Sequence, residues 1–64
     1  MTPCKRMLLL AEIPQTRIAR QLGVSCALIN QIVNGTREPY PKIRRDIACA
    51  SGISEELLFP DNGG

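Results

Sequence analysis

The sequence predicts an all-α fold in which five short helices enclose one small apolar core. Apolar residues recur at steps of three and four along most of the 64-residue chain, which is the spacing of one helix face. Ser or Thr precedes most of these stretches and Gly or Pro follows them, as expected of helix caps and stops. Aromatic residues make up only 3% of the chain. Leu, Ile, Val and Ala must therefore fill the core, which favours packed helices over a β-barrel or a sandwich.

A first helix is expected to open at Thr2 and Pro3, because a hydroxyl N-cap followed by proline suits the first helical turn. Its expected apolar stripe is Cys4, Met7, Leu8, Leu10 and Ala11. Ile13 ends this helix, since the residue before a proline is driven out of the α region. Pro14 is then predicted as the first or second residue of a second helix that runs to Leu22.

Gly23 separates the second helix from a third, at a point where a left-handed backbone costs least without a Cβ atom. Ser25 is expected to cap the third helix, and Asn34 with Gly35 to end it. The inward residues are predicted to be Ile18, Ala19 and Leu22 on the second helix, and Leu28 or Ile29 with Ile32 and Val33 on the third.

A fourth helix is predicted to open at Pro41 and stop at Gly52, with Ile43, Ile47, Ala48 and Ala50 facing inward. On it, the Ser51 hydroxyl is expected either to weaken packing or to bond a carbonyl one turn earlier. A last short helix is capped by Ser54 and ended by Pro60, after which the chain should fray. Residues 1–64 thus form a single domain with an ordered core of about 3–60.

Basic residues are concentrated in the middle of the chain. From Pro14 to Arg45 there are six Lys or Arg and one acidic residue, whereas the rest holds two basic and five acidic residues. This distribution favours a polyanionic partner, although scattered solubilising charge is an equal alternative if the charge is considered alone.

Several classes of function are disfavoured by the composition. The chain has no histidine and no glycine-rich phosphate loop, so we expect no catalytic residue, no metal site, no cofactor and no small-molecule ligand. Three widely spaced cysteines, Cys4, Cys26 and Cys49, indicate reduced thiols rather than a disulfide framework. Without an apparent leader or an apolar run of about 20 residues, a cytoplasmic protein in the bacterial nucleoid is expected.

Residues 15–35 show the pattern of a DNA-binding helix-turn-helix, which comprises two short helices, a glycine turn and a small residue, Ala19, where the helices cross. Nearly the whole chain, roughly from Lys5 to Pro60, resembles the lambda-repressor-like superfamily of phage Cro proteins and repressors. The resemblance is greatest to small Ner-like phage regulators. The matching residues are Ile18-Ala19, Leu22-Gly23-Val24-Ser25, Ile29, Ile32, Asn34-Gly35, Pro39, Ile47-Ala48, Gly52-Ile53-Ser54 and Leu57-Leu58-Phe59-Pro60.

The resemblance implies that the third helix reads bases in the major groove. Its base-contacting positions hold Ser25, Cys26, Ala27, Asn30 and Gln31. The implied phosphate contacts are Gln15, Asn34, Thr36, Arg37, Lys42 and Arg44. Because Cys26 and Ala27 are short where many relatives have long polar side chains, DNA shape is expected to carry part of the specificity.

Each of these assignments has a plainer alternative. Asn30 and Gln31 are then solvated helix residues, and Cys4 and Cys49 are small packing residues. Cys26 is an exposed thiol with no role, or a redox switch at a helix N-terminus. The dimer interface is assigned to Leu57, Leu58 and Phe59, of which one or two are expected to close the core instead.

The function that these observations favour is a sequence-specific, double-stranded DNA-binding regulator. We expect a phage or prophage repressor that blocks transcription by occupying a pseudo-palindromic operator as a homodimer. The alternative is an antitoxin-like or adaptor module whose partner is a protein, although only four residues follow Pro60 to wrap one. A DNA-bending protein is less favoured, because no basic arm or wedge hairpin is evident.

Overall fold

The computed structural model describes residues 2–60, which form five helices and no strand. In chain order these are α1 (Pro3–Leu10), α2 (Gln15–Leu22), α3 (Cys26–Asn34), α4 (Pro41–Ser51) and α5 (Glu55–Leu58). The all-α prediction is confirmed. The radius of gyration of 10.3 Å is close to the value of about 11 Å expected for a compact domain of this length. The expected fraying after Pro60 lies outside the described residues.

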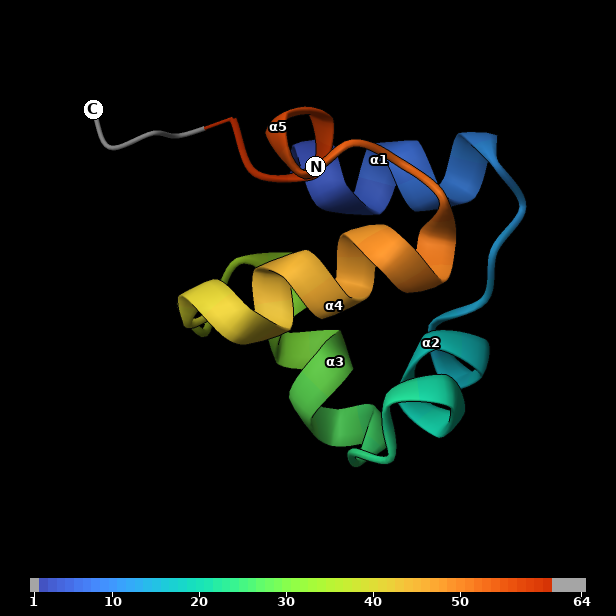
Figure 1. Cartoon of the computed structure of the whole chain (residues 1–64), viewed down its shortest axis with the longest axis vertical. Coiled ribbons are helices and arrows are strands. Elements are labelled where there is room, and N and C mark those ends of the chain that lie inside the picture. The colour runs from blue at the N-terminus through green and yellow to red at the C-terminus, as the bar shows by residue number, and fades with distance from the viewer. Residues whose placement is uncertain (1, 61–64) are drawn as a thin grey trace.

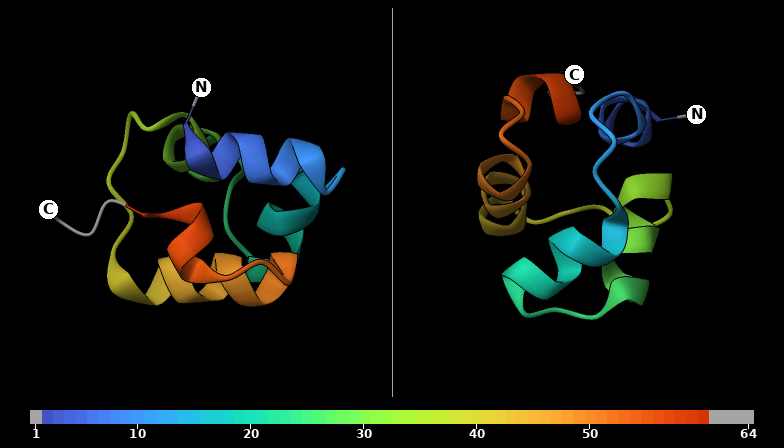
Figure 2. Two further views of the ribbon diagram at one scale, coloured as in Figure 1. Left: turned by 90° about the horizontal axis from the view of Figure 1, so that it is seen from above. Right: turned by 90° about the vertical axis from the view of Figure 1, so that its right-hand side faces the viewer.

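The helices surround the core from several directions rather than forming a parallel bundle. Helices α1 and α5 lie side by side at one end of the molecule, and α2 and α3 form the opposite end (Figure 1). Helix α4 lies between these two pairs and packs against both α2 and α5. Helix α3 packs mainly against α2 and also contacts α1. The two further views confirm that α4 and α5 cover one side and α1 and α3 the other (Figure 2).

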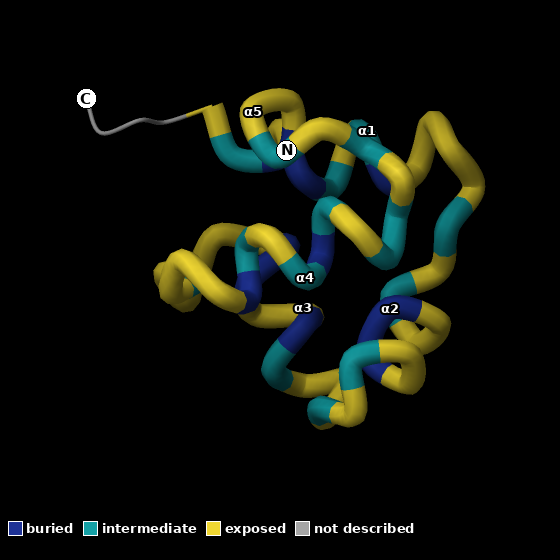
Figure 3. Tube along the Cα trace, viewed as in Figure 1, coloured by how far each residue is buried: buried dark blue, intermediate teal, exposed yellow. Residues whose placement is uncertain are grey.

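The core contains ten buried apolar residues and draws on all five helices (Figure 3). They are Cys4, Leu8, Ile18, Ala19, Ile29, Ile32, Val33, Ile43, Ile47 and Leu58. No polar or charged residue is buried among residues 2–60. Burial of these side chains is the main driving force that holds such short helices in place, because isolated helices of this length are marginal in water.

The predicted helix ends are confirmed at the three glycines. Gly23, Gly35 and Gly52 adopt φ angles of +73°, +82° and +75° directly after α2, α3 and α4. Ser25 caps α3 as predicted, since its hydroxyl oxygen accepts a hydrogen bond from the Leu28 backbone N–H at 3.1 Å. The turn between α2 and α3 is therefore specified locally, by one left-handed residue and one capping side chain.

Helix α1 ends earlier than the sequence predicts. The Ile13 N–H donates to the Leu8 carbonyl at 2.9 Å and the Glu12 N–H to the Leu9 carbonyl at 3.1 Å, which is the bonding pattern of a Schellman motif. Glu12 takes the left-handed position with a φ of +57°. As a result Leu10 is 72% exposed and Ala11 is also exposed, so their predicted places in the core stripe are wrong.

Two smaller expectations have different outcomes. Pro14 is not a helical residue, because it is the N-cap of α2 with extended backbone at ψ 147°, so the predicted start of that helix was early. The Ser51 hydroxyl donates to the Ala48 carbonyl at 3.2 Å, which confirms the expected bond to the preceding turn.

Candidate nucleic-acid interface

Helix α3 divides into a buried apolar face and an exposed polar face. Ile29, Ile32 and Val33 are no more than 4% exposed and fix the helix to the core. The five residues predicted to contact bases all lie exposed on its outer side or at its N-terminal end: Ser25, Cys26, Ala27, Asn30 and Gln31. The polar face is thus carried on a helix that cannot rotate without exposing the core.

Gln15, the first residue of α2, contacts this face directly. The Asn30 Nδ2 donates to the Gln15 Oε1 at 3.0 Å, which joins the start of α2 to the middle of α3. No side chain caps α2, because its N-cap is Pro14. The first N–H groups of α2 are therefore without a side-chain acceptor, and such a helix start favours an anion.

Asn34 extends the same set of contacts to the end of α3. Its Nδ2 donates to the Asn30 Oδ1 at 3.0 Å. Gln15, Asn30 and Asn34 therefore form one chain of amide side chains on the surface, which we call the amide chain. The side-chain amide of Gln31 makes no hydrogen bond with residues 2–60, so both its oxygen and its nitrogen remain available.

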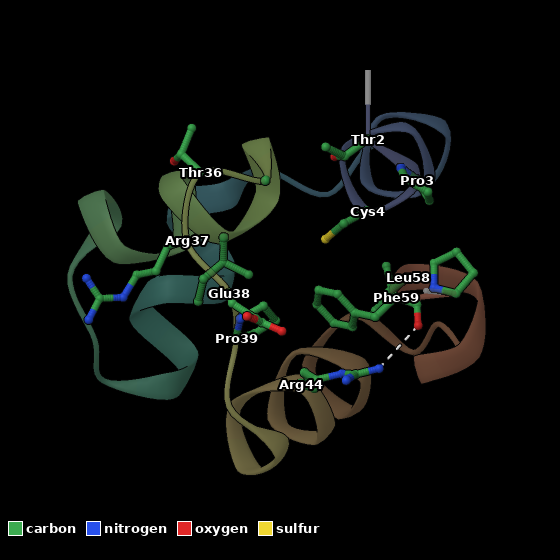
Figure 4. A pocket seen from close by; sticks show the side chains of 13 residues that line it. Thr2, Pro3, Cys4, Thr36, Arg37, Glu38, Pro39, Arg44, Leu58 and Phe59 are labelled. Carbon is green, nitrogen blue, oxygen red and sulfur yellow. Dashed lines mark hydrogen bonds between the residues drawn. The ribbon is translucent and has the colours of Figure 1, made fainter. Parts of the chain in front are cut away.

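The segment after α3 is held against the end of that helix. The Thr36 hydroxyl donates to the Gln31 carbonyl at 3.1 Å, and the backbone N–H groups of Thr36 and Arg37 donate to the same oxygen. The hydroxyl of Thr36 is thus used inside the molecule. The Arg37 side chain is exposed and points away from the side chains of Arg44 and Phe59 (Figure 4).

The two basic residues predicted on α4 lie in different surroundings. Lys42 pairs with Asp46 at 2.9 Å while its side chain stays 80% exposed, and the hydrogen bond to Asp46 raises the pKa of the lysine. Arg44 has only 26% of its side chain exposed, and its Nη2 donates to the Phe59 carbonyl at 3.2 Å. Its guanidinium also lies 3.5 Å from the Glu55 carboxylate and over the Phe59 ring. The predicted phosphate contact of Arg44 does not fit this position, because the side chain joins α4 to α5.

An open groove of about 480 Å³ lies next to these residues. Arg44 and Phe59 form one of its walls (Figure 4). The start of α1 forms another wall with Pro3 and Cys4, and the segment after α3 contributes Pro39. The groove is mainly apolar and lies beside, not on, the polar face of α3.

The three consecutive apolar residues at the end of α5, of which Phe59 is the C-cap, differ in burial. Leu57 is 54% exposed, Leu58 is 1% exposed and Phe59 is half-buried. Leu58 therefore belongs to the core and presents no side-chain surface to a second copy. Of the three residues predicted for a dimer interface, only Leu57 offers a largely exposed side chain.

Three basic residues between Pro14 and Arg45 were not assigned to the site from the sequence. Arg17 and Arg20 are exposed on α2, and Arg45 is exposed on α4. None of the three forms an ion pair within residues 2–60. The excess of positive charge between Pro14 and Arg45 indicated that basic residues there could bind a polyanion. Charge alone does not predict on which surface of the fold each side chain lies.

The three thiols are free. Cys4 is buried, as expected of a packing residue, whereas Cys26 and Cys49 are exposed, so the expected packing role of Cys49 is wrong. Burial raises the pKa of the Cys4 thiol to about 11. Within the described part of the chain no group of side chains is placed to hold a metal ion. No helix of residues 2–60 has the length and apolar character needed to cross a bilayer.

Comparisons with protein-family models, with curated proteins and with solved structures give no match to this chain. Within the described residues, a hydrogen bond joins Gln15 to the exposed face of α3, whereas Arg44 contacts the end of α5 and Leu58 lies in the core.

Proposed function

We propose that this protein is a sequence-specific, double-stranded DNA-binding regulator of the lambda-repressor-like type. In this proposal α2 and α3 form the helix-turn-helix, and α3 enters the major groove as the recognition helix. Operator occupancy, as by a phage or prophage repressor, is the proposed output of this binding.

The observation that carries the proposal is the exposed polar face of α3, supported from behind by α2. A helix of this kind fits the major groove, which is about 12 Å wide. The side chains of Ser25, Cys26 and Ala27 at the start of the face are short, so the helix backbone can approach the base edges closely there. The bond between Asn30 and Gln15 adds a rigid connection between α3 and an uncapped helix start.

Base reading is assigned first to Gln31. Its amide has both hydrogen-bonding atoms available, which is the requirement for a bidentate pair with the N6 and N7 atoms of adenine. Ala27 is assigned to contact with a thymine methyl group. The exposed Ser25 and Cys26 are proposed to lie at the end of α3 that enters the major groove of the DNA. Neither histidine nor a long cationic side chain is present on this face.

Phosphate contacts are assigned to Gln15 and Arg37, with Lys42 in support. Gln15 lies at the uncapped start of α2, where the helix dipole favours an anion. Arg37 is exposed and forms no ion pair within residues 2–60. Lys42 shares its charge with Asp46 and should contribute less. Arg44 and the Thr36 hydroxyl are left out because they are used inside the molecule.

The operator is proposed to be pseudo-palindromic and bound by a homodimer, with half-sites about 34 Å apart. Leu57 is the proposed centre of the contact between the two copies, since it is an exposed leucine on a helix whose other apolar residues are covered. A small contact of this kind is weak in solution, and the operator would complete the dimer.

Selection of bound sequences from a random duplex pool tests the proposal. The expected result is one enriched motif with twofold symmetry. Competition against unselected duplex at two salt concentrations then separates specific from non-specific binding. A pool that remains random after selection contradicts the proposal.

A protein-interaction module, such as an antitoxin or adaptor, is the second candidate. It is favoured by three exposed leucines on α1 and α5, namely Leu9, Leu10 and Leu57. The neighbouring genes discriminate the candidates: a toxin gene next to this one favours the module, and a divergent promoter beside phage genes favours the repressor.

A further inference from the structure

We propose that Asn30 is a positioning residue and not a base reader, and that the amide chain fixes Gln15 as a hydrogen-bond donor to a DNA phosphate. This inference rests on the proposed function and narrows it. It gives Gln15 one orientation, removes one residue from the base-reading set, and leaves Gln31 as the amide that recognises a base.

Both polar atoms of the Asn30 side-chain amide are hydrogen-bonded to other residues of the protein. Its Oδ1 accepts from Asn34 and its Nδ2 donates to Gln15, each at 3.0 Å. A bidentate pair with adenine needs the oxygen and the nitrogen of one amide directed together at the same base edge. In Asn30 these two atoms point to opposite partners along the protein surface. Because each atom already has a protein partner, Asn30 is less suited than Gln31 to present both atoms to one base.

The hydrogen bonds of the amide chain all run in one direction, from Asn34 through Asn30 to Gln15. A side-chain amide has an oxygen that accepts and a nitrogen that donates two hydrogen bonds. Because Asn34 donates to the oxygen of Asn30, the nitrogen of Asn30 faces Gln15. The Oε1 of Gln15 accepts the hydrogen bond from that nitrogen. The Nε2 of Gln15 then keeps both of its N–H groups for another partner.

The N–H groups of the Gln15 Nε2 match a phosphate, whose oxygens only accept hydrogen bonds. The Nε2 group lies on the first residue of α2, beside backbone N–H groups that no side chain caps. Both sets of donors therefore serve one anion. The opposite chain direction would use one of the Gln15 N–H groups inside the protein and weaken this site.

A double-mutant cycle on the selected operator duplex tests the coupling. Gln15→Ala and Asn30→Ala are each expected to weaken binding by roughly 5- to 10-fold, the effect of one hydrogen bond of ordinary strength. The double variant should be within about 2-fold of Gln15→Ala, because Asn30 acts through Gln15. Gln15→Ala combined with Gln31→Ala is the matched control, and there the two losses should multiply.

Sequence preference provides a second readout that a merely structural role would not move. Asn30→Ala should weaken binding to operator and to random duplex by the same factor, so that their ratio is kept. Gln31→Ala should reduce that ratio. Thermal unfolding checks that Asn30→Ala remains folded, and only a small change is expected because all three amides lie at the surface.

The outcomes separate this inference from the function on which it rests. If the wild-type protein prefers its operator but the losses for Gln15 and Asn30 multiply, the positioning role is wrong and the proposed function stands. The same holds if Asn30→Ala relaxes preference at one base pair. A wild-type protein with no preference for any duplex overturns both.

Discussion

The guanidinium of Arg44 lies 5.3 Å from the centroid of the Phe59 ring, and its Nη2 donates to the carbonyl of the same residue at 3.2 Å. One side chain thus joins α4 to the end of α5 by a charged hydrogen bond and a cation–π contact. Glu55, 3.5 Å from the Nε, balances its charge. This arginine lies in the basic part of the sequence, yet its contacts are those of a residue that stabilises the fold.

Arg44→Ala should therefore lower the free energy of unfolding by about 1–3 kcal/mol, from the loss of the charged hydrogen bond and the ring contact. Chemical denaturation measures this. Arg45→Ala is the matched control, since Arg45 is exposed, and it should change stability by less than about 0.5 kcal/mol. An Arg44→Ala protein that is as stable as wild type but binds DNA with a smaller salt dependence would restore the phosphate role.

Gln31→Ala and Arg37→Ala should affect DNA binding in different ways. Loss of Gln31 removes a bidentate base contact, so preference for the operator over random duplex should fall by about 1–3 kcal/mol. Loss of Arg37 removes a phosphate contact, so both affinities should fall together and the slope of log affinity against log salt should decrease by about one. Competition binding at several salt concentrations separates the two. An unchanged preference in Gln31→Ala contradicts its assignment.

Leu57 and Leu58 are neighbours in sequence with opposite expected effects. Leu58→Ala should cost about 2–5 kcal/mol of stability, because it leaves a cavity in the core. Leu57→Glu should leave stability nearly unchanged but weaken binding to a duplex with two half-sites. Binding to a single half-site should be unaffected by Leu57→Glu. Equal loss on both duplexes would remove Leu57 from the dimer contact.

The left-handed residue at the end of α1 provides a test of local structure. Glu12 has a φ of +57°, a conformation that costs a residue with a Cβ atom about 1 kcal/mol relative to glycine. Glu12→Gly should therefore stabilise the protein by roughly that amount in chemical denaturation. Glycine also raises the conformational entropy of the unfolded chain, which offsets part of this stabilisation. A clear loss of stability would mean that the Glu12 side chain has a favourable role at the surface.

Alkaline pH should weaken the fold through Cys4. Burial raises the pKa of this thiol from 9.0 to about 11, so the folded protein keeps its proton where the unfolded chain has lost it. The stabilising contribution is complete below pH 9 and is lost as the pH rises to about 11, by about 2 kcal/mol. Unfolding curves measured across this range test it. Cys4→Ala should have a flatter pH profile, and an identical profile would contradict the buried thiol as the cause.

Local signals in the sequence predicted the helix ends well. Gly23, Gly35 and Gly52 each end a helix in the left-handed region, and Ser25 caps α3, because these features depend on one residue and its immediate neighbours. The end of α1 was missed for a related reason. There a glutamate takes the position usually held by glycine, and the nearby Pro14 gave a stronger but misleading stop signal.

Contacts between distant residues could not be predicted from local patterns. Arg44 meets Phe59, and Asn30 meets Gln15, across 15 positions in each case. The charge of Arg44 and the amide of Asn30 indicated that each side chain makes a polar contact. Only the packing of the helices decides whether the partner in that contact is a ligand or another residue of the protein. The separation of Leu57 from Leu58 likewise depends on which side of α5 faces α1 and α4.

Titration of the isotope-labelled protein with its selected duplex at low ionic strength, followed by amide chemical shifts, tests the DNA-binding surface most directly. We expect the largest shifts at the start of α2 and along the outer residues of α3, with Gln31 and the side-chain amide of Gln15 among them. The residues of α5 that face α1 should change little. Resonances of α3 that stay in place while duplex is added in excess would contradict α3 as the DNA-binding helix.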